Sequence, residues 1–305
     1  MIKNLKSNKI ICMLVFIICL FLIIKPTICI NASLNGVSVW ALKVFPTLFP
    51  FFVFTKLLVN LSEPKPNVLD KYFCKIYNAP SGSFFIYFLS IISGYPMGAK
   101  LISDAYKNKK INSLQAEKML AFCSVSGPMF MVGSVGVSIL NSYSAGIIIL
   151  ISNIIASLVN GLIFRPKINH NKDTFQYTTI KKNALSDIVA DALTSILIVG
   201  SYIVLSFIIV DVLKQIGLIS KLCELLCYVF NCKDVAPILE SVLCGILEIT
   251  KGIVELNITN CSLFLKTIIA SALIGFGGIS ILLQSKAFLN YLNIKTSTIV
   301  KQKIV

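Results

Sequence analysis

The fold is decided by the stretch Phe84-Phe85-Ile86-Tyr87-Phe88-Leu89-Ser90-Ile91-Ile92-Ser93-Gly94-Tyr95-Pro96-Met97-Gly98-Ala99-Lys100. It starts as an apolar run of the kind that spans a membrane, and Ser93-Gly94-Tyr95-Pro96 then interrupts it. The next apolar run carries a second interruption, Ser124-Val125-Ser126-Gly127-Pro128. In lipid, backbone groups freed by such interruptions are tolerated only where protein or a polar cavity satisfies them. Paired interruptions of this kind indicate a binding site near the middle of the membrane.

The composition excludes a soluble domain. Of the 305 residues, 56% are hydrophobic and 13% are charged, whereas soluble domains carry about 25% charged residues. Several windows of about 20 residues contain few or no charges, and this is the length that an α-helix needs to cross a bilayer. The sequence therefore predicts an all-α, polytopic helical membrane protein in the cell membrane, with residues 1–305 in a single integral membrane domain.

Basic residues dominate the charge, with a formal net charge of +15, and all but one of them are lysines. In a membrane protein, such an excess indicates which loops stay in the cytoplasm. It places both the N-terminus and the C-terminus there. Nucleic-acid binding is the rival explanation of a basic chain. It is not favoured, because the sequence has no arginine cluster and no DNA- or RNA-binding motif, so no nucleic-acid partner is expected.

Residues for metal binding or catalysis are not grouped in the sequence. The ten cysteines are scattered without a Cys-x-x-Cys pair, and the single histidine, His170, lies in a polar loop. There is no phosphate loop ending in Gly-Lys-Ser or Gly-Lys-Thr, and Ser126-Gly127 does not lie in a Gly-x-Ser-x-Gly elbow. We therefore expect no catalytic residue, no metal and no cofactor, and a protein that is not an enzyme.

Apolar runs divide the chain into helical segments. In the first half we expect a transmembrane helix at 10–30, a Pro-kinked helix at 37–61, a re-entrant or broken segment at 84–100, a broken helix at 119–140, a helix at 145–164 and a cytoplasmic loop at 165–186. In the second half we expect a helix at 188–210, an amphipathic segment at 218–230, a charged re-entrant or spanning segment at 235–256 and a Gly-broken helix at 263–284. A cleaved signal peptide is the alternative for the first helix.

The two halves of the chain share a plan. Each has a plain helix, then a charged or Gly-broken segment, then a second Gly-broken segment. Residue-by-residue similarity between the halves is faint, so the hypothesis of two inverted halves rests on hydropathy and loop charge.

Glu248 is the ionisable residue that we assign to the site. It lies in the apolar segment 243–252, where a lone carboxylate is costly and usually faces a cavity or a partner. There it would accept hydroxyl groups of a solute or carry a coupling proton. A structural pair with Lys251, three positions on, is the alternative. Asp187 and Asp191 are expected to be surface charges at a helix start.

Small and hydroxyl-bearing residues at the interruptions complete the candidate site. Free N–H groups at the start of a half-helix favour anionic or oxygen-rich ligands. Close packing of helices through small residues is the alternative explanation of each interruption. The predicted substrate-binding residues are Ser93, Gly94, Tyr95, Pro96, Ser124, Ser126, Gly127, Glu248, Thr250, Gly275, Gly277, Gly278 and Ser280.

Five motifs, taken in chain order, resemble one family. They are Phe45-Pro46-Thr47-Leu48-Phe49-Pro50-Phe51-Phe52, Ser93-Gly94-Tyr95-Pro96-Met97-Gly98-Ala99-Lys100, Ser126-Gly127-Pro128-Met129-Phe130-Met131-Val132-Gly133-Ser134-Val135-Gly136, Leu247-Glu248-Ile249-Thr250-Lys251-Gly252 and Gly275-Phe276-Gly277-Gly278-Ile279-Ser280. From about Val37 to Gln284 the chain resembles the YlbJ-type sporulation integral membrane proteins, within the wider group of nucleoside-recognition, or gate-domain, membrane proteins. The last motif is also similar to the Gly-Phe-Ala-Asn segment of concentrative nucleoside transporters, with Gly278 in place of the asparagine that would contact substrate there.

The resemblance implies a role in endospore formation and a gate domain related to the cores of nucleoside transporters. Together with the interruptions and Glu248, it favours a transporter or channel-like protein for a small polar solute. The alternative is a non-transporting membrane protein that assembles with copies of itself or with other sporulation proteins. The expected partners are therefore the lipid bilayer and either a small polar solute or such protein partners.

Overall fold

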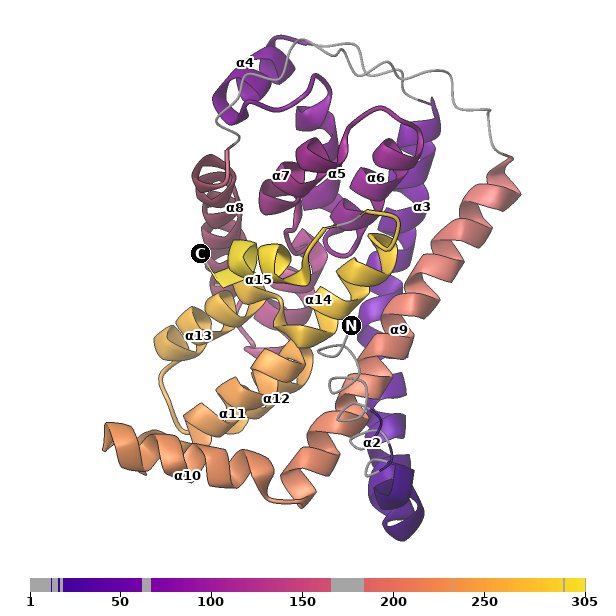
Figure 1. The fold of residues 1–305 in the computed structure, drawn as a ribbon. Helices are drawn as coiled ribbons and strands as arrows, with labels where there is room; N and C mark the ends of the chain where they lie inside the picture. The colour runs from indigo at the N-terminus through magenta and orange to yellow at the C-terminus, as the bar shows by residue number, and fades with distance from the viewer. Residues whose placement is uncertain are drawn as a thin grey trace, which may run out of the picture.

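The computed structural model describes residues 12, 16, 19–61, 67–165, 184–231, 233–292 and 294–304. Over these residues every regular element is a helix (Figure 1). Four helical runs are long and apolar enough to cross a membrane, judged by length and composition: Pro26–Leu61, Tyr143–Ile163, Leu185–Gln215 and Leu263–Phe288. The prediction of an all-α polytopic membrane protein is confirmed.

Two long helices lie side by side and form one flank of the molecule (Figure 1). The first is a continuous run of α2 (Pro26–Val39), a π-helical turn at Trp40–Val44 and α3 (Phe45–Leu61). The second is α9 (Leu185–Gln215). The indole N–H of Trp40 donates to the carbonyl of Ile196 in α9 at 3.2 Å, which fixes the two helices against each other.

The first long helix differs from the sequence prediction in its start. Separate helices were expected at 10–30 and 37–61, and residues 31–36 were expected to connect them. In the structure α2 runs through this segment, because the Ser33 hydroxyl bonds to the Cys29 carbonyl at 2.8 Å and Gly36 packs against α9. Much of the predicted helix 10–30 and most of the predicted loop 165–186 lie outside the described residues.

A short amphipathic helix precedes the first helical hairpin. It is α4 (Val68–Tyr77), and its buried Asp70 accepts hydrogen bonds from the N–H groups of Gly82 and Phe84 at 2.8 and 3.2 Å, at the start of α5. Burial and the nearby Asp70 carboxylate raise the pKa of the Cys74 thiol to about 12. The neutral thiol therefore bonds to the Pro80 carbonyl at 3.1 Å and helps to hold the same turn.

The first hairpin consists of α5 (Ser83–Ser93) and α6 (Met97–Lys107). Eleven residues of α-helix are about 16 Å long, roughly half of the 30 Å hydrocarbon thickness. The two helices also pack on each other as a hairpin, and its re-entry into the membrane stays a prediction. After it come α7 (Ser113–Cys123), an unwound stretch at 124–127, the π-helix η2 (Met129–Ile139) and α8 (Tyr143–Ile163).

The second half repeats this order of elements. After α9 come α10 (Leu218–Phe230), a 3₁₀ turn at Lys233–Val235, the hairpin of α11 (Ala236–Leu247) and α12 (Ile249–Ile258), then α13 (Leu263–Phe276), α14 (Gly278–Phe288) and α15 (Thr296–Ile304). The two amphipathic helices, α4 and α10, lie at opposite ends of the molecule (Figure 1). Two inverted halves would have the same order of elements, with corresponding helices at opposite ends of the molecule.

Ion pairs tie each hairpin to the long helices. Near the start of α9, the carboxylate of Asp191 pairs with Lys56 of α3 and, at 2.8 Å, with Lys100 of α6. Near its other end, Asp211 pairs with Lys251 of α12. Twenty residues separate the two aspartates, or about 30 Å of helix, which matches the hydrocarbon thickness. Asp191 is therefore not the plain surface charge that the sequence suggested, because α3 and α6 bring two lysines to it.

Candidate functional site

The two interruptions of the first half touch each other. Gly94, which ends α5, has φ +72°, and a Cβ added there would lie 2.3 Å from the backbone nitrogen of Gly127. A Cβ on Gly98 would lie 2.1 Å from the carbonyl oxygen of Cys123. Glycine is required at these positions because two backbones meet with no room for a side chain.

The interruptions of the second half also pack together. Gly278 has φ +63°, and a Cβ there would lie 3.2 Å from the carbonyl oxygen of Gly245 in α11 and 3.2 Å from the side chain of Ile249 in α12. Inside the hairpin, a Cβ on Gly252 would lie 2.2 Å from the Cα of Gly245. Each half therefore places the tip of its hairpin against its own broken helix.

Both interruptions of the first half and the hairpin tip of the second half line a small cavity of about 40 Å³, together with Ile281 and Gln284 of α14. The Tyr95 hydroxyl donates to the carbonyl of Ile274, near the end of α13, and so joins the first half to the second. The polar residues that line the cavity are Tyr95, Ser126, Glu248, Thr250 and Gln284. They come from the interruptions of both halves or from the helices that start there.

Glu248 is the buried carboxylate of this cavity, with 3% of its surface exposed. It has an extended backbone between α11 and α12, and its Oε2 accepts a hydrogen bond from the N–H of Lys251 at 2.8 Å, as an N-cap. The side-chain pair that the sequence allowed between Glu248 and Lys251 is not formed. Instead the Lys251 ammonium pairs with Asp211 of α9, because capping turns Glu248 back over the start of its own helix.

The structure brings together part of the predicted site. Five of its residues line the 40 Å³ cavity: Tyr95, Ser126, Gly127, Glu248 and Thr250. Four others form the backbone of the interruptions: Gly94, Pro96, Gly277 and Gly278. Ser280 lies behind the cavity, where it accepts a hydrogen bond from Gln284 at 3.2 Å. Ser93 bonds to Thr55 of α3 and is fully buried, and Ser124 and Gly275 face a second cavity.

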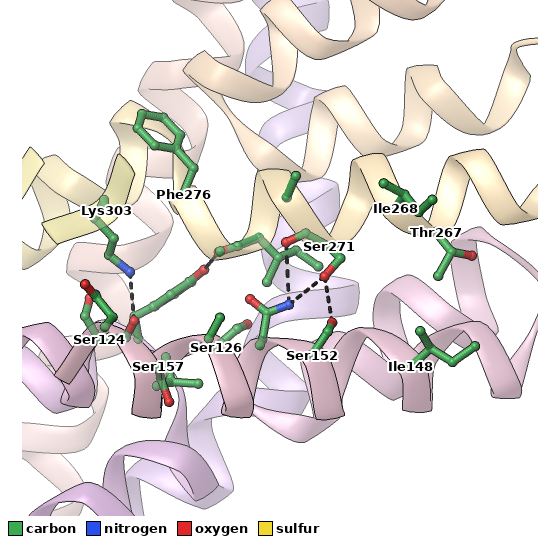
Figure 2. Close-up of a pocket in the computed structure, with 18 of the residues that line it drawn as sticks. Ser124, Ser126, Ile148, Ser152, Ser157, Thr267, Ile268, Ser271, Phe276 and Lys303 are labelled. Carbon is green, nitrogen blue, oxygen red and sulfur yellow. Dashed lines mark hydrogen bonds between the residues drawn. The ribbon is translucent and has the colours of Figure 1, made fainter. Parts of the chain in front are cut away.

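The second cavity is a furrow of about 860 Å³ between α8, α13 and α15 (Figure 2). On its walls, the Ser152 and Ser271 hydroxyls are bonded at 2.8 Å, and the Asn153 amide donates to Ser271 at 3.2 Å. Four predicted site residues line this furrow, namely Tyr95, Ser124, Ser126 and Gly275, but the sequence analysis did not assign its polar wall on α8. A signal was present, because Asn153, Ser157 and Asn160 recur at helical spacing on one face of an otherwise apolar helix.

Lys303 of α15 supplies the charge of the furrow. Its ammonium donates to the carbonyl oxygen of Ser124 at 2.8 Å and lies 4.8 Å from the ring centroid of Tyr95. No carboxylate of the described residues lies within ion-pair distance of it, and none lines the furrow. Among the residues that the structure covers, no three His, Cys, Asp or Glu side chains are grouped as a metal site requires.

Comparison with known proteins gives one informative similarity. The chain is 28% identical over 298 residues to a protein of Bacillus subtilis (strain 168) described as sporulation integral membrane protein YlbJ. The match covers 88% of this chain and 72% of that protein. No family model matches the chain. No solved structure matches it.

Proposed function

We propose, from the premise that this chain is a YlbJ-type sporulation integral membrane protein, that it moves a small polar solute across a membrane of the sporulating cell. In this proposal it is a transporter or channel-like protein with a gate-like core. The sporulation role in this proposal rests on that similarity, and the argument for transport rests on the geometry of the interruptions.

The observation that carries the proposal is the meeting of the interruptions at one cavity that contains Glu248. An ionisable group surrounded by apolar helices is expensive and usually marks a pathway or a site. Membrane transporters build their sites where discontinuous helices of two repeats meet, because the freed backbone groups can then serve a ligand. Packing of small residues alone explains the glycines, but it does not explain a buried carboxylate at the same place.

The chemistry of the cavity suits a solute that both donates and accepts hydrogen bonds. Glu248 offers carboxylate oxygens, whereas the hydroxyls of Ser126 and Thr250 and the amide of Gln284 can donate or accept. The cavity of about 40 Å³ has room for only a few water molecules. A larger solute therefore requires the hairpins to separate, and the ion pairs of Asp191 and Asp211 hold them in the closed arrangement.

A thermal-shift screen of the purified full-length protein in detergent tests this proposal. The ligands are nucleosides, nucleobases, amino acids and dicarboxylates, each applied to the wild type, to Glu248→Gln and to the control Glu224→Gln on the exposed face of α10. A cargo should raise the melting temperature by mass action in the wild type and in the control. It should do so less in Glu248→Gln, because the variant lacks the charged acceptor.

The screen also separates transport from the assembly role. A ligand that stabilises wild type and Glu248→Gln equally would show that the 40 Å³ cavity is not the site. If Glu248→Gln and Gly94→Leu left sporulation intact while changes in the loops abolished it, the protein would act by assembly with partners. Nucleosides are one ligand class among the four, and Gly278 occupies the position of the asparagine that binds them in concentrative transporters.

A further inference from the structure

The 860 Å³ furrow opens sideways, toward the acyl chains of the bilayer. Three apolar side chains line it and are also exposed, namely Ile148 (58%), Phe264 (75%) and Ile268 (49%). In a membrane protein, such side chains face lipid, because apolar surface is not stable against water. The furrow is thus accessible to a molecule that is already in the membrane, and it adjoins the cavity at Glu248, because Tyr95 and Ser126 line both.

The two ends of the furrow differ in chemistry. Figure 2 shows Lys303 at one end, with Ile148, Ile268 and Thr267 at the other. At the charged end, the side-chain Oδ1 of Asn160 is buried and has no hydrogen-bond partner in the described part of the chain. An ammonium with no counter-charge and a buried acceptor with no donor are costly, unless a ligand supplies a negative charge and a donor.

The charged end lies near one end of α8. The Asn160 amide donates to the carbonyl of Gln302 at 2.6 Å, which places the backbone of α15 beside Asn160, and the Lys303 side chain reaches from there to Ser124. Asn160 is three residues, or about 5 Å, from the end of α8 at Ile163. The basic residues that follow α8 assign this end to the cytoplasmic side. From Asn160 to Ile148 is about 18 Å of helix, close to the roughly 15 Å of one hydrocarbon leaflet.

We propose that the furrow is a binding site for an anionic phospholipid of the cytoplasmic leaflet with a hydroxyl-bearing head group, of the phosphatidylglycerol type. Its phosphate accepts from Lys303, a head-group hydroxyl donates to Asn160 Oδ1, and one acyl chain lies along Ile148 and Ile268. The negative charge, the hydroxyl donor and the apolar chain are each matched by one feature of the furrow. This site does not depend on the proposed transport function.

Native mass spectrometry of the full chain, titrated with dioleoylphosphatidylglycerol or dioleoylphosphatidylcholine, measures the proposed binding. The wild type should retain phosphatidylglycerol with higher affinity than phosphatidylcholine. Lys303→Gln should weaken retention of phosphatidylglycerol about tenfold, the order expected for loss of one charge-assisted contact. The matched control is Lys301→Gln, an exposed lysine of the same helix, which should not change it.

A second pair of variants tests the place of the acyl chain. Ala272→Trp puts an indole at an exposed position that lines the furrow, and Ile155→Trp puts one on the lipid face of α8 outside it. The first should abolish retention, and the second should leave it unchanged. Equal retention of the two lipids, or equal effects of the two lysine variants, would overturn the proposal. So would competition by free glycerol 3-phosphate that equals competition by the lipid, because the acyl chain would then have no role.

Discussion

Replacement of Gly94 by alanine tests whether the interruptions are packed as the structure places them. Gly94 has φ +72° and ψ 179°, a region essentially confined to glycine, which costs an L-residue about 1–3 kcal/mol. A Cβ there would also lie 2.3 Å from the nitrogen of Gly127, which is backbone and cannot rotate away. Forcing extra volume into a packed core costs about 1–3 kcal/mol more. The total expected loss for Gly94→Ala is therefore about 2–6 kcal/mol.

The chain offers a control that has positive φ but no clash. Gly217, between α9 and α10, has φ +76° and ψ 14°, a left-handed conformation, and no atom lies within 4 Å of the position of its Cβ. Gly217→Ala should therefore lose only the backbone contribution of about 1–2 kcal/mol. Gly133→Ala, where φ is ordinary and the nearest atom to the Cβ lies at 3.6 Å, should not destabilise the protein measurably.

The assay is unfolding in mixed micelles by titration with sodium dodecyl sulfate, with refolding as the test of reversibility. Helix content by circular dichroism and the fluorescence of Trp40, the single tryptophan, report the transition. Gly94→Ala should lose more stability than Gly217→Ala, because its Cβ meets the backbone of Gly127 and its ψ of 179° is less favourable for an L-residue. Equal losses in the two variants would refute the reasoning, because they would mean that the backbones at Gly94 and Gly127 do not meet.

Three further outcomes are expected in the same assay. Asp70→Asn should lower the unfolding free energy by about 1–3 kcal/mol, because it weakens charge-assisted bonds to the start of α5, whereas Asp234→Asn, at an exposed position, should not. Asp191→Asn leaves the ammonium groups of Lys56 and Lys100 without their shared carboxylate. Because this carboxylate is half exposed, the unfolding free energy should fall by only about 1 kcal/mol, and by less in 1 M salt. A loss of stability that salt does not change would contradict the ion pairs. Gly200→Ala puts a Cβ 2.5 Å from the Trp40 indole and should lower the unfolding free energy by about 1–3 kcal/mol. Adding Trp40→Leu to this variant should restore part of the lost stability. If it restored none, the first long helix and α9 would not meet at Gly200.

Much of the candidate site could be predicted from local sequence signals. The interruptions at Gly94 and Gly277 were identifiable because clustered residues such as Gly94-Tyr95-Pro96 and Gly277-Gly278 free backbone groups that lipid cannot satisfy. Glu248 was identifiable because a carboxylate in an apolar segment is costly. Both arguments depend only on the chemistry of a few neighbouring residues. The polar face of α8 was also readable, but serines and asparagines in a membrane helix commonly serve helix packing, so it pointed to no site by itself.

The sequence alone thus determined the membrane class, the positions of the helix interruptions and the buried carboxylate, since each follows from hydropathy and backbone chemistry over short stretches. Only the tertiary structure decided which groups are partners. It paired Lys251 with Asp211 rather than with Glu248, brought two lysines to Asp191, and joined α8, α13 and α15 around Lys303. The physical reason is that a side chain can be satisfied by any group within a few ångströms, and the partners of each of these ion pairs are 40 or more residues apart in the chain.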